Sequence, residues 1–478
     1  MRAALRRLAD TGTRAKASKR LYSHVRFHPT LQLDFLPKYL DPRIQSDAPF
    51  MDLTFLGSSA QCSTAVRGVC SALLRTRQKS YLIDAGDGVC RQLQRADLST
   101  PVDTICITHL HGDHIWGLAP VVRQVAGVAR DAALQVCGPP GLYAFLVTAF
   151  RISGMTEVPD GARVEVYEMV NRGGPDAWDM QKRPLLYMDS RTGEGHVEGL
   201  VQRFLEPDED GYWTIPCPPE TQQRRGKAAL GHSKTKMRAG RVKHIKDSFG
   251  YVAIEQPRRL IDSAMCKKLG LPPSQKYYKL LIGETVTTDA GRVISPEEVC
   301  REVPGRKLAY VGDSCDPRAM ATLIEGADVL VHEATFLDAD KSRKEAIEKG
   351  HSTSGMAGDF ARRLNVGALF MNHFAPHNFK NGYRYAVTTS REEARGSSGA
   401  EGPLPVIVAE DFMHVKLSGN KVVDVHGSQW LASLLRTSPD EPHIEVLGHR
   451  HAEPMANGRK VKSRANATGA KALEASRK

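Results

Sequence analysis

A cluster of histidines with one aspartate, His109-Leu-His111-Gly-Asp113-His114, constrains this chain more than any other feature of its 478 residues. It follows an apolar run at 102–108 that has the composition of a short strand. His109 and His111 are two residues apart, so their side chains point the same way from an extended segment. The glycine then lets the chain curl back and present Asp113 and His114. Imidazole and carboxylate groups at this spacing are typical zinc ligands, so we expect one short loop to hold two metal ions from opposite sides.

Two metal ions need more ligands than one loop supplies, and three later residues are suitable. His244 lies in Val-Lys-His244-Ile, Asp313 in Val-Gly-Asp313-Ser and His373 in Met-Asn-His373-Phe. Each lies at or near the end of an apolar run, where a strand can hold a ligand rigidly. An aspartate after a glycine can bridge two ions with its two oxygens. Read alone, each would be an ordinary core histidine or turn aspartate, but together with the histidine cluster they predict two coordination shells.

A histidine and a glutamate suit a catalytic role beside the metal ions. His351 lies in Gly-His351-Ser-Thr, and Glu333 lies in Val-His-Glu333-Ala-Thr. An imidazole near the metals can hold a phosphate oxygen or protonate a leaving alkoxide. A carboxylate behind it would fix its tautomer. The plainer interpretations are a helix N-terminus at His351 and an ordinary buried acid at Glu333.

The pattern of apolar runs predicts an α/β fold whose strands end in polar turns. Residues 171–240 are polar and charge-segregated, and we interpret them as an insertion outside the core. Residues 256–300 are rich in lysine and arginine and predict a projecting basic arm or a second insertion. The expected strands are 51–57, 80–86, 102–108, 134–137, 308–311, 329–331, 368–371 and 404–409, and the expected helices are 115–126, 142–152, 317–324 and 354–364.

Charge and termini bear on partners and compartment. The formal net charge of +12 suits a polyanionic partner such as nucleic acid, or else reflects basic tails. Residues 1–26 are rich in arginine and poor in acids, which is typical of a mitochondrial transit peptide or of a disordered basic tail. Residues 449–478 predict a basic, disordered tail that could touch nucleic acid or carry a nuclear address. Nine cysteines without regular spacing favour a reducing compartment, and the sequence lacks a run of about 18 apolar residues that would span a membrane.

Several motifs, in the same order, resemble those of the metallo-β-lactamase superfamily. Within it, the chain is most similar to the short form of the ribonuclease Z family, which processes the 3′ end of tRNA. The likeness covers about 51–380. Besides the histidine cluster, the matching motifs are Phe-Leu-Gly-Ser-Ser at 55–59, Ile-Asp-Ala-Gly-Asp-Gly at 83–88, Phe-Gly-Tyr at 249–251, His-Glu-Ala-Thr at 332–335, His-Ser-Thr at 351–353 and Asn-His-Phe at 372–374.

The resemblance implies an αβ/βα four-layer sandwich spanning about 51–425, with two zinc ions or with manganese or another divalent metal in their place. Asp113 would help to activate the attacking water, and His351, oriented by Glu333, would steady the phosphate or the leaving oxygen. The implied ligands are His109, His111 and His244 for one ion, Asp113, His114 and His373 for the other, and Asp313 as the bridge.

The same resemblance implies an endoribonuclease that removes 3′ trailers from precursor tRNA and leaves a tRNA 3′-OH. The arm at 256–300 falls where the family carries its tRNA-grasping element, and the short form works as a homodimer. The family's P-x-K-x-R-N loop, linked to rejecting mature CCA ends, reads Ser-Thr-Ala-Val-Arg67-Gly here. The implied RNA-binding residues are Arg67, Arg258, Arg259, Lys267, Lys268, Lys276 and Lys279.

Two alternatives stay open on the sequence. One is a phosphodiesterase or hydrolase of the same fold that acts on another substrate, against which the basic arm argues. The other is a catalytically silent RNA-binding member, against which the full set of ligands argues. The compartment, mitochondrial or nuclear, is open as well.

Overall fold

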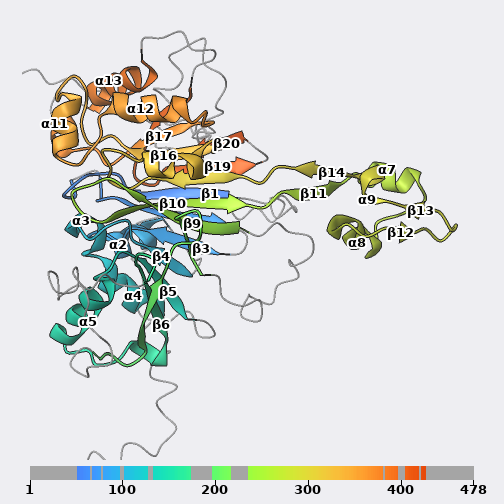
Figure 1. Cartoon of the computed structure of the whole chain (residues 1–478), viewed down its shortest axis with the longest axis horizontal. Helices are drawn as coiled ribbons and strands as arrows, with labels where there is room; N and C mark the ends of the chain where they lie inside the picture. Colours follow the sequence, from blue (N-terminus) through green and yellow to red (C-terminus); the bar gives the residue numbers. More distant parts are fainter. Residues whose placement is uncertain are drawn as a thin grey trace, which may run out of the picture.

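A computed structural model describes residues 51–64, 67–76, 79–96, 102–126, 133–173, 196–216, 235–379, 383–396, 404–418 and 421–426. The basic segments expected at 1–26 and 449–478 lie outside this part of the chain. Two large β-sheets form the body, and an arm projects from it (Figure 1). Among the described residues, none of the helices has the length and apolar character needed to cross a membrane.

The first sheet has nine strands in the order β20-β19-β1-β2-β3-β4-β5-β6-β7. β1, β2 and β3 are antiparallel, whereas β3 to β7 run parallel. Helices return the chain between β3 and β6, as parallel pairing requires. The strands are β1 Met51–Gly57, β2 Ser71–Thr76, β3 Ser80–Ile83, β4 Thr104–Cys106, β5 Leu134–Gly138, β6 Val164–Met169, β7 Leu200–Leu205, β19 His414–Ser418 and β20 Lys421–His426, and the helices are α2 Val89–Arg95, α3 Gly112–Ile115, α4 Leu118–Ala126, α5 Leu142–Ile152 and the short η1 Pro159–Gly161.

The second sheet has seven strands in the order β18-β17-β16-β15-β10-β9-β8. β15 to β18 run parallel, and β8, β9 and β10 are antiparallel. The strands are β8 Trp213–Thr214, β9 Thr235–Val242, β10 Ser248–Glu255, β15 Lys307–Tyr310, β16 Val329–Glu333, β17 Leu369–Asn372 and β18 Val406–Val408, and the helices are η4 Arg318–Met320, α10 Ala321–Ile324, α11 Arg343–Glu348, α12 Ser354–Arg363, η5 Pro376–Phe379 and α13 Tyr383–Arg395.

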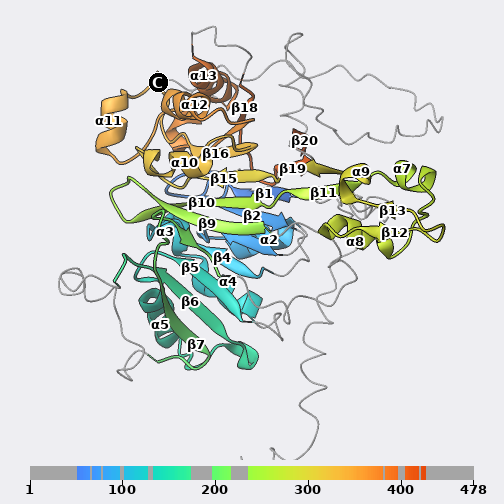
Figure 2. The same ribbon diagram turned by 45° about the vertical axis from the view of Figure 1, so that its right-hand side comes forward.

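The two sheets pack face to face, and helices cover both outer sides (Figures 1 and 2). Phe55 from β1 and Phe370 from β17 are fully buried between the sheets, with ring centroids 6.1 Å apart. A second core lies between the nine-stranded sheet and α2, α4 and α5, and a third lies between the seven-stranded sheet and α10, α12 and α13. Each sheet thus buries both faces. This four-layer arrangement confirms the predicted αβ/βα sandwich.

The interpretation of 171–240 as a segment outside the core is wrong for its described parts. β7 extends the nine-stranded sheet, and β8 and β9 extend the seven-stranded sheet. Along β9, Met237 and Ala239 are buried on one face and Val242 on the other, but Lys236, Arg238 and Arg241 interrupt both faces and hide the strand in the sequence. The central stretches 174–195 and 217–234 lie outside the described residues.

Residues 256–303 form the projecting arm (Figures 1 and 2). Its stalk is the antiparallel pair β11 Arg258–Ile261 and β14 Cys300–Val303. The head contains a small core of its own that includes Cys266, Leu280 and Ile294. The remaining elements of the head are α7 Ser263–Lys268, α8 Lys276–Ile282, β12 Val286–Thr287, β13 Val293–Ile294 and α9 Pro296–Val299.

Loops from both sheets meet at one edge of the sandwich. The parallel strands β3 and β4 in one sheet, and β15, β16 and β17 in the other, end there, and the loops that follow them carry the polar motifs. An isolated bridge joins Ser59, which follows β1, to Phe374, which follows β17. The fold therefore brings motifs that are far apart in the sequence to a single place.

Candidate metal centre

The predicted metal ligands all lie at this edge, on loops or in the short helix α3. His109 and His111 follow β4, and Asp113 and His114 lie in α3, whose N-cap is His111. The later ligands come from the other sheet: His244 lies in the turn between β9 and β10, Asp313 follows β15 and His373 follows β17.

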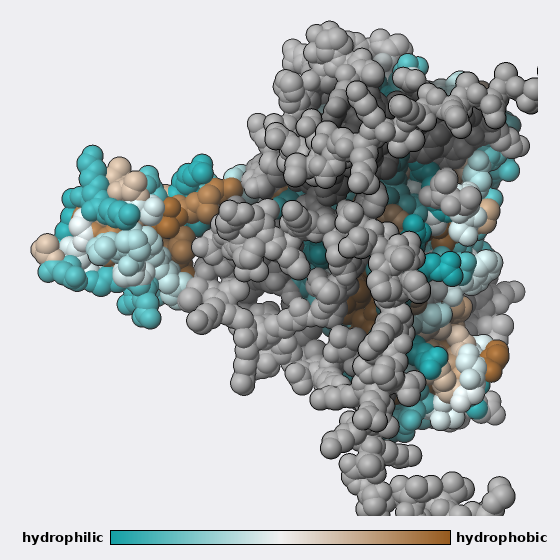
Figure 3. Space-filling model, turned by 180° about the vertical axis from the view of Figure 1, so that it is seen from behind, coloured by the Kyte–Doolittle hydropathy of each residue, from teal (hydrophilic) through white to brown (hydrophobic). Residues whose placement is uncertain are grey.

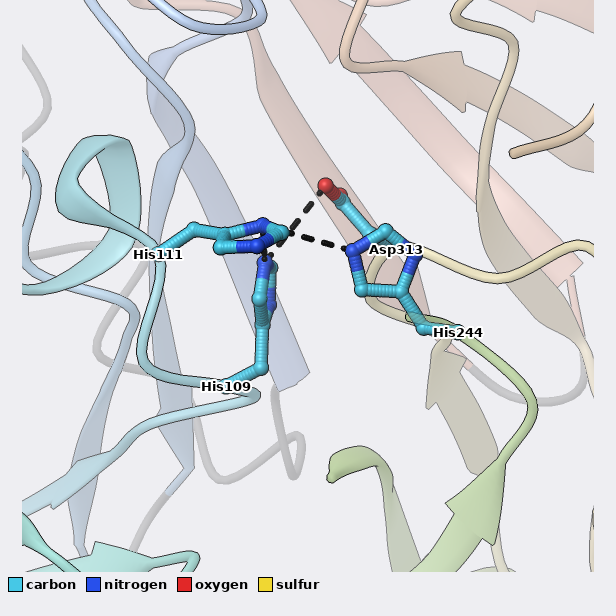
Figure 4. A group of neighbouring side chains, drawn as sticks. All are labelled: His109, His111, His244 and Asp313. Atoms are coloured by element: carbon cyan, nitrogen blue, oxygen red, sulfur yellow. Dashed lines mark hydrogen bonds and ion pairs between the residues drawn. The ribbon is translucent and has the colours of Figure 1, made fainter. Parts of the chain in front are cut away.

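The first cluster consists of His109, His111, His244 and Asp313 (Figure 4). His111 Nδ1 lies 2.9 Å from His109 Nε2 and 3.3 Å from His244 Nε2. Asp313 Oδ2 lies 3.6 Å from His109 Nε2. One candidate ligand atom from each residue lies within 4.8 Å of all the others.

The second cluster consists of Asp113, His114 and His373. His373 Nε2 lies 3.4 Å from His114 Nε2 and 3.4 Å from Asp113 Oδ2. Asp313 Oδ2 is 3.5 Å from His114 Nε2 and 3.2 Å from His373 Nε2. The same carboxylate oxygen therefore faces imidazoles of both clusters.

The spacing of these atoms fits metal coordination. Ring nitrogens whose lone pairs face a common point repel one another unless a cation lies between them. Around a tetrahedral zinc with bonds of about 2.0–2.1 Å to nitrogen, neighbouring ligand atoms stand about 3.3 Å apart. The contacts of 3.2–3.6 Å to Asp313 and of 3.3 Å and 3.4 Å between imidazoles are close to this value. The residues present therefore form a donor set for divalent metal.

Hydrogen bonds on the opposite ring nitrogens orient the imidazoles. His244 Nδ1 donates to the Gly350 carbonyl at 2.6 Å, and His114 Nδ1 donates to Asp84 Oδ2 at 2.8 Å. Each bond fixes the tautomer and turns the Nε2 lone pair toward the cluster.

The electrostatic field of the site also favours a cation. Burial lowers the pKa of all three imidazoles in the first cluster, which keeps their lone pairs available. Burial also opposes a charge on His114, but the carboxylates of Asp313 and Asp84 outweigh it and raise the pKa of His114 well above its usual value. Carboxylates that attract a proton so strongly attract a metal ion at the same point.

Glu333 and His351 form a pair beside the clusters. Both oxygens of Glu333 lie 3.1 Å from His351 Nδ1, and Glu333 also accepts hydrogen bonds from Ser314 N and Thr335 Oγ1. Burial opposes a charged imidazole, but Glu333 outweighs it and raises the pKa of His351 to about 9. His351 Nδ1 lies 3.9 Å from Asp313 Oδ2, so the pair borders the metal ligands.

Two supporting residues received no role from the sequence. Asp84 accepts hydrogen bonds from Thr108 N and Thr108 Oγ1 as well as from His114, and it takes a positive φ of 59°. The sequence signal that could have identified Asp84 is its position directly after β3 and two residues before Gly86. Thr335 Oγ1 lies 2.9 Å from His373 Nδ1 and links this ring to Glu333.

Arg67 lies where it cannot reach RNA, so its prediction as an RNA-binding residue is wrong. It is 5% exposed, and its Nη1 donates to Ser58 Oγ at 2.7 Å and to the Ala409 carbonyl at 3.0 Å. Its guanidinium also lies 5.9 Å from the ring centroid of Phe374. Arg67 thus ties the loop after β1 to the end of β18 in the other sheet. A motif match by itself carries no information about burial.

The other predicted RNA-binding residues lie on the arm and not at the metal centre. Lys267, Lys268 and Lys279 are exposed. Lys276 pairs with Asp289 at 2.9 Å, and Arg259 lies 3.9 Å from Glu302, so acids offset part of the arm's charge. The backbone of Arg258 lies in β11, and its side chain is outside the described part. Figure 3 shows mainly hydrophilic residues over the outer part of the arm on the face turned to the viewer.

Known proteins with similar sequences decide the family. The ribonuclease Z of Gloeothece citriformis is 33% identical over 350 residues, which cover 72% of this chain and 91% of the relative. The ribonuclease Z of Picosynechococcus sp. is 32% identical over 378 residues, 78% of this chain and 98% of the relative. The chain belongs to the ribonuclease Z family. The ribonuclease Z of Halobacterium salinarum is 30% identical over 354 residues, 74% of this chain and 93% of the relative.

Two further comparisons involve a family model and a solved structure. The model of the anti-Pycsar protein Apyc1 family matches residues 51–136, a part that includes the histidine cluster. The crystal structure of the human tRNase Z, short form, is 24% identical and aligns with a TM-score of 0.47 over 76% of this chain and 98% of that chain. The family assignment rests on the sequence relatives, and it confirms the resemblance drawn from the motifs.

Proposed function

We propose that this member of the ribonuclease Z family is a metal-dependent endoribonuclease that removes 3′ trailers from precursor tRNA and leaves a 3′-OH on the tRNA. The observation that carries the proposal is the double cluster in which Asp313 faces imidazoles of both sets. Such a site concentrates positive charge at one point once metal is bound, and phosphodiester hydrolysis develops negative charge on the phosphate oxygens. The complete donor set argues against a silent RNA-binding protein.

Two zinc ions suit the arrangement of donors. Two groups of side chains share one carboxylate, and each group has the nitrogen and oxygen donors that zinc prefers. Bound there, zinc supplies a Lewis acid that polarises the phosphate and lowers the pKa of a water molecule. Manganese or another divalent metal would use the same ligands. We assign His109, His111 and His244 to one ion, Asp113, His114 and His373 to the other, and Asp313 to both.

Asp113 and His351 handle the protons of the reaction. Asp113 Oδ2 accepts a hydrogen bond from Gln61 N at 2.7 Å, which fixes the carboxylate, and we assign its Oδ1 to the attacking water. His351 is held on Nδ1 by Glu333, so its Nε2 can donate to a phosphate oxygen or to the leaving 3′ oxygen. The tRNA side of the broken bond then ends in 3′-OH, and the trailer carries the 5′-phosphate.

The arm supplies the grip on tRNA. Exposed Lys267 and Lys268 on α7 and Lys279 on α8 present ammonium groups to solvent, and such groups bind phosphates without reading sequence. A grip on backbone and shape suits a substrate whose members share a fold but differ in sequence.

The place of the arm favours a homodimer in which one subunit holds tRNA for the site of the other. β10 begins shortly after His244, and the arm follows its far end. An eight-residue strand spans about 26 Å, so the arm leaves the body far from its own metal centre (Figure 1). A subunit with His111→Ala, mixed with a subunit whose arm lysines are reversed to glutamate, should regain activity at low precursor concentration, where the first alone is inactive and the second alone binds the precursor weakly. Failure to regain it under conditions of subunit exchange argues for action within one subunit.

We also propose a mitochondrial location on the arginine-rich composition of residues 1–26. Imaging of a reporter fused after residues 1–30 tests it. A nuclear or cytosolic location of that reporter overturns the proposal. So does a second reporter, fused to residues 449–478, that enters the nucleus.

The decisive experiment is cleavage of a 3′-trailered precursor tRNA by the purified, metal-loaded protein. We expect a cut at the trailer junction, with a 3′-OH on the tRNA and a 5′-phosphate on the trailer. His111→Ala serves as the inactive control. Elemental analysis should give about two metal ions per chain, as a binuclear site requires. If the precursor stays intact while a small phosphodiester is hydrolysed, the protein is a phosphodiesterase that acts on another substrate, and the proposed tRNA function is wrong.

A further inference from the structure

Trp116 exposes 67% of its surface and lies two residues after the candidate metal ligand His114. It directly follows α3, which carries Asp113 and His114. Trp213, the other tryptophan in the described part of the chain, is 3% exposed and packs edge-on against Phe249 between the sheets. A single exposed apolar side chain is ordinary on a protein surface. The position of Trp116 and the close packing around it are what set it apart.

Close packing at two glycines, Gly112 and Gly117, surrounds the indole. A Cβ on Gly112 would lie 2.2 Å from two atoms of the Trp116 ring, so the ring lies against this glycine. A Cβ on Gly117 would lie 2.1 Å from the Gly86 carbonyl oxygen, so the chain after Trp116 is pressed against a neighbouring loop. Trp116 N also donates to Gly112 O at 2.9 Å. The ring therefore has a defined place before substrate arrives, which lowers the entropic cost of a contact with it.

We propose that Trp116 is a base-stacking residue for a nucleobase next to the scissile phosphodiester. The proposal rests on the proposed function. Gly112 links the candidate ligands His111 and Asp113, so a phosphate held by the metal cluster places an adjoining base near the indole. The 3′ end of a precursor tRNA is single-stranded beyond the acceptor stem, and its bases are available to stack on aromatic rings. Every base has a π-face, so this contact positions the strand without reading its sequence.

The test compares Trp116→Ala, Trp116→Phe and the control Ile152→Ala on the full-length protein. Ile152 is an 83% exposed apolar residue at the end of α5. We expect Trp116→Ala to lower kcat/KM for the precursor on the order of tenfold or more, and Trp116→Phe to keep most of the activity. Metal content and thermal unfolding should match the wild type in all three variants. The same proteins are then assayed on precursors with an abasic nucleotide on one or the other side of the cleaved bond.

Stacking predicts that one abasic position slows the wild type and that Trp116→Ala has little further effect on that substrate. Equal cleavage of the normal precursor by wild type and Trp116→Ala overturns the inference. So does an equal loss from Trp116→Ala on normal and on both abasic substrates. If Trp116→Ala folds poorly, Trp116→Leu replaces it in the same comparison. A wild-type protein that leaves the precursor intact contradicts the proposed function instead, so the two failures can be told apart.

Discussion

The carboxylate of Glu333 faces His351 Nδ1 with both of its oxygens, each at 3.1 Å. Glu333 is 2% exposed, and the backbone of Ser314 and the hydroxyl of Thr335 hold it in place. The imidazole is therefore oriented by a group that is itself fixed. In the proposed function, Glu333 is a positioning residue and His351 is the group that meets the substrate.

Replacing Glu333 by Gln should lower kcat by about 10- to 100-fold while leaving KM nearly unchanged, because Glu333 acts through His351. Steady-state kinetics on precursor tRNA measure both constants. Since the two residues act as one unit, the double variant Glu333→Gln/His351→Ala should be no slower than His351→Ala alone. Losses that multiply in the double variant contradict the pairing.

Asp84→Asn should weaken metal binding by about 10- to 100-fold, because it removes the charge that accepts from His114 Nδ1. Competition with a chromogenic chelator measures the affinity. Asp87→Asn, an exposed acid in the same loop, is the matched control and should bind metal as the wild type does. Superimposable chelator curves for the Asp84 variant and the wild type would refute the role of Asp84.

Arg67→Met should lower the free energy of unfolding by about 1.5–3 kcal/mol, since it deletes charge-assisted hydrogen bonds in a buried place. Urea unfolding followed by circular dichroism gives the value. The KM for precursor tRNA of the folded variant should stay close to that of the wild type. A raised KM with unchanged stability would restore Arg67 as an RNA contact.

Reversing Lys267 and Lys268 to glutamate should weaken precursor binding and make it less sensitive to salt, because phosphate contacts release counterions. Binding measured over a range of salt concentrations gives the slope, which should fall by about two units if both lysines meet phosphates. Cleavage chemistry at saturating substrate should persist. The control Arg91→Glu/Arg123→Glu changes exposed cations on α2 and α4 and should keep the wild-type slope.

The sequence predicted which histidines and aspartates the fold brings together, because most of them follow a strand and stand in motifs of unusual composition. His109 and His373 could both be assigned to the metal centre from their motifs, since histidines and acids rarely gather at such spacing unless they bind a metal ion. Asp84 and Thr335 could not be given roles in the same way. Acids and hydroxyls that orient metal ligands are recognised only by their contacts in the folded structure, because many loops contain the same residue types.

The errors in the fold and the site have physical causes as well. β9 was missed because Lys236 and Arg238 lie on one side of the strand and Arg241 on the other, which breaks the apolar alternation. Arg67 was misplaced because a guanidinium can serve a phosphate or a protein carbonyl equally well, and its surroundings decide which. Both errors concern residues whose polarity conceals their burial.

The head of the arm has its own core, and a two-stranded stalk joins it to the body. Where the stalk meets the body, Arg306 donates to both oxygens of Glu255 at 2.6 Å and to the Leu417 carbonyl at 2.9 Å. The head therefore packs around its own core, and these hydrogen bonds anchor the base of its stalk to the body. Under the proposed function, grafting a head with another RNA preference onto the same stalk should change the choice of substrate and leave the metal centre unchanged.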